Sequence, residues 1–176
     1  MWSGVLDTTN RRNIVITGFM GTGKSTVGRL VADRLGRVFI DTDEEIVRRV
    51  GMTIPEIFQR QGEQGFRHIE RRVCRFLAAQ DSYVISTGGG MLVDESNREV
   101  MISSGVVICL TAIPDVIKAR LTADKTERPL LKGDWRALLE KRQPAYAAIP
   151  YQIDTSDKTP EQIAEEVIEL WHKIST

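Results

Sequence analysis

Cysteine, histidine and aromatic residues are scarce in this chain of 176 residues, which has two cysteines, two histidines and 6% aromatic residues. Cys74 and Cys109 lie far apart and form no CxxC motif, and only His68 and His172 are available to help them bind a metal. These numbers argue against a zinc or redox site. We therefore expect both thiols to be reduced and buried in the core.

A net charge of one sign and long apolar runs are also absent. The 24 Lys and Arg residues balance the 24 Asp and Glu residues, so the chain lacks the basic excess that is typical of nucleic-acid-binding proteins. No apolar stretch is long enough for a signal peptide or a membrane span. We expect a cytoplasmic protein with no nucleic-acid or membrane partner, built as one domain over residues 1–176 with a flexible tail at 1–12.

Short apolar segments alternate with helical patterns along the chain, which indicates an α/β fold with a parallel sheet covered by helices on both faces. Thr53 and Glu56 have the spacing of a capping box, and Gly62 is expected to interrupt the helix that begins there. A polar segment at 122–134 is expected to form a mobile loop over a site. The five predicted strands are 13–17, 38–41, 83–86, 106–110 and 151–154.

A phosphate-binding motif lies between the first predicted strand and a predicted helix. Residues 18–26 read GFMGTGKST and fit the pattern G-x-x-x-x-G-K-[ST]. In such a loop Lys24 reaches the β- and γ-phosphates, and the hydroxyl of Ser25 is a ligand of Mg²⁺. The motif predicts binding of a purine nucleoside triphosphate, and the residues expected to contact it are Gly21, Thr22, Gly23, Lys24, Ser25 and Thr26.

Two acidic residues follow the second predicted strand in the sequence DTD. Residues two apart on a strand share a side, so Asp41 and Asp43 can both face the crevice where ligands of α/β sheets bind. We expect Asp41 to hold Mg²⁺ through water and Asp43 to bind hydroxyl groups of a phosphoryl acceptor. The alternative is that one of them only caps the helix that begins near Glu44.

Two further patterns have both a functional and a structural interpretation. Arg67 and Glu70 are three apart on a predicted helix, where the pair forms either a preorganised fork for a carboxylate or a surface ion pair; the helix alone favours the ion pair. Gly88, Gly89 and Gly90 follow the third strand, where they form either a flexible turn or a place where backbone N–H groups approach a ligand.

The motifs GFMGTGKST, DTD, GEQGFRHIE, STGGG, ERPLL and KRQPAY occur together and in this order between about residues 13 and 171. In this they resemble the shikimate kinases. The resemblance implies a three-layer P-loop NTPase fold like that of nucleoside monophosphate kinases, with a five-stranded parallel sheet in the order 2-3-1-4-5. It also implies a substrate-binding region at 42–80, a lid at 122–134 and a monomeric state.

The same resemblance implies that ATP, with Mg²⁺, phosphorylates the 3-hydroxyl of shikimate. Arg67 and Arg142 would bind the shikimate carboxylate, Glu70 would orient Arg67, and Asp43 would stand beside the attacking hydroxyl. Phe58 and Phe66 would form an apolar wall beside the ring, and the three glycines would contact the acceptor and the transferred group.

On the nucleotide side, the resemblance implies that Arg128 closes over the γ-phosphate from the lid. Arg120 would stack on the adenine, and residues 153–161 would lie on its other face. Two alternatives stay open. One is a kinase of the same fold for another acceptor, such as gluconate or a nucleoside monophosphate. The other is a nucleotide-dependent regulatory protein that has kept the fold and lost the chemistry.

Overall fold

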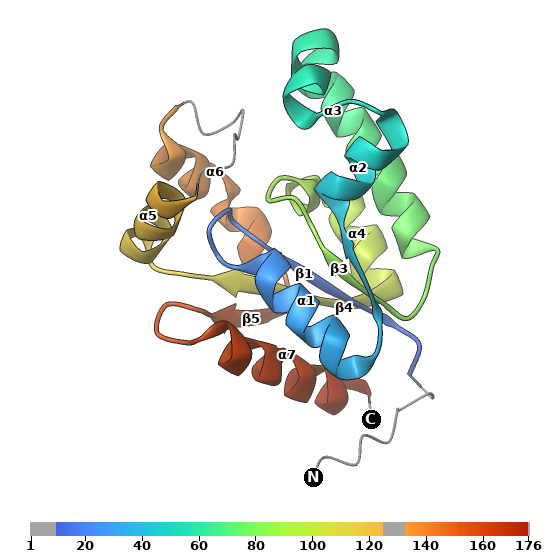
Figure 1. Ribbon diagram of the computed structural model, residues 1–176, viewed down its shortest axis with the longest axis vertical. Coiled ribbons are helices and arrows are strands. Elements are labelled where there is room, and N and C mark those ends of the chain that lie inside the picture. The colour runs from blue at the N-terminus through green and yellow to red at the C-terminus, as the bar shows by residue number, and fades with distance from the viewer. Residues whose placement is uncertain (1–9, 125–132, 176) are drawn as a thin grey trace.

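The five predicted strands form a single parallel sheet in a computed structural model that describes residues 10–124 and 133–175 (Figure 1). The strand order is β2-β3-β1-β4-β5. This confirms the order that the family resemblance implied. Each strand begins and ends within one residue of its predicted bounds: β1 Asn13–Gly18, β2 Val38–Asp41, β3 Tyr83–Ser86, β4 Gly105–Thr111 and β5 Tyr151–Asp154.

Helices cover both faces of this sheet (Figure 1). One face packs against α1 (Lys24–Leu35) and α7 (Pro160–Ser175), and the other against α3 (Ile54–Ala78), α4 (Glu95–Ser104) and α6 (Trp135–Ala147). The remaining elements are α2 (Thr42–Val50), the 3₁₀ helix η1 (Met91–Val93) and α5 (Pro114–Ala123). No helix of the described ranges is long and apolar enough to cross a membrane.

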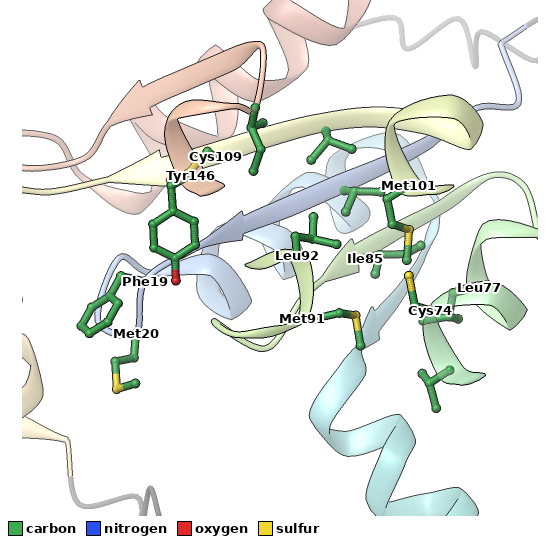
Figure 2. Packing of buried hydrophobic residues seen from close by; sticks show 14 of the residues in the cluster. Phe19, Met20, Cys74, Leu77, Ile85, Met91, Leu92, Met101, Cys109 and Tyr146 are labelled. Carbon is green, nitrogen blue, oxygen red and sulfur yellow. The ribbon is translucent and has the colours of Figure 1, made fainter. Parts of the chain in front are cut away.

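Successive side chains of a strand point to opposite faces of the sheet, so the core has two layers, one on each face. Ile14 and Ile16 of β1 face the side that holds the buried Trp171 of α7, whereas Val15 faces the opposite side. On that opposite side, Met91 and other apolar residues of α3, η1 and α4 gather against β3 (Figure 2). Cys74 and Cys109 lie in the same layer, and burial raises the pKa of each thiol to about 12, which confirms their expected place in the core.

The third helix has the start and the interruption that its sequence predicts. The Thr53 hydroxyl accepts a hydrogen bond from the N–H of Glu56, whose carboxylate accepts one from the N–H of Thr53. Gly62 has φ 69° and ψ −177°, so α3 consists of two helical segments that meet at this residue. The residue has a conformation that L-residues with a side chain rarely adopt.

The last three residues of the expected tail at 1–12 are attached to the sheet. The backbone oxygens of Asn10 and Arg12 accept hydrogen bonds from Arg37, at 2.6 and 2.8 Å. That of Arg11 accepts one from the N–H of Ser82, at 2.6 Å. Residues 10–12 of the expected flexible tail therefore make hydrogen bonds to the rest of the chain. Residues 1–9 lie outside the described part of the chain, as do residues 125–132 of the expected lid.

Candidate active site

The phosphate-binding motif forms a tight loop between β1 and α1. Gly23 precedes the helix with φ 88°, and a Cβ at Gly18 would lie 2.3 Å from the carbonyl oxygen of Leu110. Within the loop, the Thr22 hydroxyl and the Lys24 ammonium both donate to the carbonyl of Phe19, at 2.7 and 3.0 Å. The first turn of α1 has no acidic residue. Its positive end is therefore available to an anion, as a phosphate site requires.

Three oxygen-bearing side chains meet at the start of α1. The Ser25 hydroxyl donates to Asp41 Oδ2 at 2.7 Å and lies 3.4 Å from the hydroxyl of Ser86 at the end of β3. Hydroxyl and carboxylate oxygens suit Mg²⁺, which in nucleotide sites is completed by phosphate and water oxygens. Residues 10–124 and 133–175 contain no group of three or more His, Cys, Asp or Glu side chains that could hold a metal. A cation here would therefore need those phosphate and water ligands.

The strand-based prediction for the DTD motif was wrong in its geometry. β2 ends at Asp41 and α2 begins at Thr42, so Asp43 lies in the first turn of a helix. The carboxylate of Asp41 accepts hydrogen bonds from the N–H groups of Asp43 and Glu44, at 2.9 and 3.3 Å. Asp41 is thus the helix cap that was considered as the alternative, and it also binds Ser25. Asp43 lies in the first turn of α2 with its carboxylate beside Gly88.

The three glycines of this segment make room for side chains of the site. A Cβ on Gly88 would lie 2.7 Å from Asp43 Oδ1, one on Gly89 would lie 3.2 Å from Arg142 Nη1, and one on Gly90 would lie 2.5 Å from Arg67 Nη1. None of the three has a positive φ, so backbone conformation does not explain the glycines. The structure places these three side chains beside the glycines, and the approach of a ligand to their N–H groups stays a prediction.

Arg67 is part of a partly buried ion pair. Its Nη1 donates to Glu70, whose side chain is 2% exposed, and its Nη2 lies 3.3 Å from the more exposed Glu63. Burial raises the pKa of Glu70 to about 7, although the neighbouring Arg67 lowers it. The burial of Glu70 distinguishes this pair from a solvated surface ion pair. The interpretation that α3 favoured on its sequence alone was therefore wrong.

Arg142 on α6 is the most enclosed cation of the site, because only 4% of the residue is exposed. Its Nη1 atom is buried and finds no hydrogen-bond partner among the described residues. The guanidinium carbon lies 5.8 Å from the centre of the Phe19 ring. A buried donor without a partner is costly, and a buried charge more so. The arrangement is the one expected of a residue whose partner is an anionic ligand.

The two phenylalanines expected to line the acceptor site also lie together. The rings of Phe58 and Phe66 are 4.8 Å apart, on either side of the break at Gly62. Phe66 is buried and Phe58 partly buried. The Arg67 guanidinium carbon lies 5.4 Å from the Phe66 ring centre, so the apolar wall adjoins the cationic group.

Sequence reasoning missed two polar residues of this site. The Thr42 hydroxyl accepts a hydrogen bond from the N–H of Gly88 at 2.8 Å, and the Tyr146 hydroxyl donates to the carbonyl of Gly89 at 2.6 Å. Both residues are buried. Each had a signal in the sequence: Thr42 is the middle residue of DTD, and Tyr146 follows Arg142 at helical spacing within KRQPAY.

A cavity of about 280 Å³ lies beside the phosphate-binding loop and is lined by Thr22, Gly23, Thr26, Arg120, Lys158 and Pro160. Arg120 donates to the carbonyl of Gly21 at 3.1 Å and to the hydroxyl and carbonyl of Thr155 at 3.0 and 2.9 Å. These bonds fix the plane of its guanidinium between the loop and the segment at 153–161. Arg128 lies outside the described residues, so its predicted place is not described.

Comparisons with known proteins agree with this geometry. The family model described as shikimate kinase matches residues 20–172. The shikimate kinase of Geobacter sulfurreducens is 47% identical over 161 residues, which are 89% of this chain and 88% of that protein. That of Caldanaerobacter subterraneus subsp. tengcongensis is 44% identical over 168 residues, 93% and 98% of the two chains. The solved structure of shikimate kinase from Acinetobacter baumannii in complex with shikimate has a TM-score of 0.87 and 38% identity, and the match covers 93% and 94% of the two chains. This chain therefore belongs to the shikimate kinase family.

Proposed function

We propose that this enzyme transfers the γ-phosphoryl group of ATP to the 3-hydroxyl of shikimate, giving shikimate 3-phosphate and ADP, a step in the synthesis of chorismate and aromatic amino acids. The proposal depends above all on Arg142, whose buried Nη1 has no partner in the described structure. Arg67 and Asp43 adjoin the same glycine segment. Two cations and one carboxylate are the groups needed to bind an acid that carries several hydroxyls.

On the acceptor side, Arg142 and Arg67 bind the carboxylate of shikimate, because guanidinium groups pair with carboxylates through two parallel hydrogen bonds. Glu70 holds Arg67 in position from behind, through their buried ion pair. Phe58 and Phe66 cover the apolar part of the ring. Asp43 accepts hydrogen bonds from ring hydroxyls and stands next to the attacking one.

On the nucleotide side, the N–H groups of residues 21–26 and the ammonium of Lys24 surround the phosphates. The cavity beside Arg120 and Pro160 takes the adenine. Ser25 and Asp41 would hold Mg²⁺, which supplies positive charge to the β- and γ-phosphate oxygens when it is bound. We assign Arg128 to the lid, where its charge would add to that of Lys24.

Transfer of the phosphoryl group requires mainly positioning and neutralisation of charge. Lys24 provides charge on the nucleotide side, and Asp43 aligns the acceptor hydroxyl and receives its proton as the bond forms. The transition state is loose, so little deprotonation has to precede transfer. Alignment by Asp43 therefore contributes more to the rate than its basicity.

The decisive experiment is an ADP-release assay with shikimate, gluconate and a nucleoside monophosphate as acceptors, together with calorimetry of shikimate with and without ADP and Mg²⁺. We expect turnover with shikimate alone and tighter shikimate binding in the presence of ADP and Mg²⁺. Turnover with another acceptor in preference to shikimate would refute the proposal. Nucleotide binding without any phosphorylated product would support the regulatory alternative.

We also propose that the enzyme works as a monomer in the cytoplasm, as the sequence led us to expect. Sedimentation equilibrium over a range of protein concentrations tests the first part. A constant mass near 19.8 kDa is the expected result. A mass near twice that value would contradict it.

A further inference from the structure

Tyr146 lies in the last turn of α6, four residues after Arg142, so the two buried side chains are neighbours on one face of the helix. Pro144 stands between them and has no N–H, which removes one hydrogen bond from this part of the helix. The helix end is held instead through the carbonyl of Tyr146. It accepts hydrogen bonds from the N–H of Ile149 at 3.0 Å and from the side chain of Gln152 on β5 at 2.7 Å.

The hydroxyl of Tyr146 holds the middle of the glycine segment. The carbonyls of Gly88 and Gly90 accept hydrogen bonds from backbone N–H groups of η1, at 3.1 and 3.2 Å. The carbonyl of Gly89 accepts its bond from Tyr146, at 2.6 Å. Because the peptide unit is planar, fixing this carbonyl also fixes the direction of the next N–H group. Burial raises the pKa of Tyr146 to about 12, so its hydroxyl remains a donor at neutral pH.

This peptide unit is the surface against which both arginines of the acceptor site lie. A Cβ on Gly89 would be 3.2 Å from Arg142, and one on Gly90 would be 2.5 Å from Arg67. A rotation of the peptide would therefore move one or both guanidinium groups. Figure 2 shows the hydroxyl end of Tyr146 on the side of Phe19 and Met20, at the start of the phosphate-binding loop.

We propose that Tyr146 is a positioning residue for the acceptor: through Gly89 it sets the spacing of Arg67 and Arg142, and so the fit of the carboxylate of shikimate. This inference depends on the proposed function, since it assigns Tyr146 a part in binding the same substrate. The residue touches neither ATP nor the acceptor in this account. It acts through the peptide bond that it holds and through its direct contact with the Arg142 side chain, which lowers the pKa of the hydroxyl against the effect of burial.

The test is Tyr146→Phe, which removes one oxygen atom and keeps the ring that packs beside Cys109. Loss of a buried hydrogen bond that leaves an acceptor without its partner is expected to raise the KM for shikimate about 5- to 20-fold. We expect kcat to change by less than about 3-fold and the KM for ATP to stay unchanged, because the interaction concerns acceptor binding. Tyr151→Phe is the matched control, since the hydroxyl of Tyr151 has no hydrogen bond within the described part of the chain.

The two proposals fail in different ways. If the wild-type enzyme phosphorylates shikimate and Tyr146→Phe has the same shikimate KM, the positioning role is wrong and the proposed function stands. If the wild-type enzyme neither binds nor phosphorylates shikimate, both are wrong. A variant that melts far below the wild type and loses affinity for ATP and shikimate equally would assign the hydroxyl to folding, and would also overturn the role proposed here.

Discussion

Replacing Gly90 by alanine tests whether the glycine segment exists to make room for Arg67. Gly90 has φ −93° and ψ −13°, a conformation that alanine adopts without strain. The new Cβ would lie 2.5 Å from Arg67 Nη1, whereas ordinary van der Waals contact begins at 3.4 Å, so the guanidinium has to move by about 0.9 Å. Misplacement of a substrate-binding group by about 1 Å can cost about 100-fold in rate. We expect kcat/KM for shikimate to fall by about that factor.

The free energy of unfolding is expected to change little. The Cβ would lie 2.5 to 2.9 Å from three atoms of the Arg67 guanidinium, which has to shift against its ion pair with the buried Glu70. This cost opposes the gain of about 0.4–1 kcal/mol that alanine brings at a compatible glycine site. The assay combines steady-state kinetics with urea unfolding of Gly90→Ala, Arg67→Ala and the double variant. If alanine acts through Arg67, the double variant will be no worse than Arg67→Ala alone. Full additivity of the two losses, or wild-type kcat/KM in Gly90→Ala, would refute the reasoning.

Three further predictions concern charged groups of the site. Asp43→Asn should lower kcat far more than the affinity for ATP in isothermal titration; equal losses would remove Asp43 from its proposed role. Arg142→Met should raise the shikimate KM at least about 100-fold. It should not lower the melting temperature, because it removes a buried cation that has an unsatisfied donor. A large fall in melting temperature would show that the cation is stabilised within the protein. Glu70 has a folded-state pKa raised from 4.5 to about 7, so its contribution to stability is full below pH 4.5 and is lost as the pH rises to about 7. At about 1.4 kcal/mol per pH unit, the loss of stability between these pH values amounts to roughly 3 kcal/mol. Urea unfolding at several pH values should find that Glu70→Gln lacks this pH dependence. The same pH profile of stability in Glu70→Gln and the wild type would contradict the raised pKa.

Much of this architecture could be predicted because its signals are local. The apolar strands, the capping box at Thr53 and the break at Gly62 each depend on residues within one turn or one strand. The phosphate-binding loop is a continuous motif whose glycines and lysine act together. The order of the strands depends on contacts between distant segments, and only the resemblance to a family supplied it.

The acceptor site was harder to predict, because its members are separated by up to a hundred residues and meet only in the fold. Arg142 gave no sign in the sequence that one of its nitrogens would be buried without a partner. Asp41 and Asp43 were placed on a strand because β2 was assumed to continue, whereas the capping of α2 by Asp41 ends it. The glycine segment lies beside Asp43, Arg67 and Arg142, but these neighbours in space could not be read from its sequence.

The break at Gly62 also bears on which molecules this enzyme can accept. Phe58 and Phe66 lie on opposite sides of it, so the angle between two helical segments, rather than any one side chain, sets the distance between their rings. If the two rings line the acceptor site as proposed, truncating either ring would enlarge that site locally, whereas a substitution at Gly62 would shift both rings, because no other residue tolerates φ 69° with ψ −177° well. Attempts to redirect the enzyme to bulkier acids should therefore change the backbone at the Gly62 break in α3.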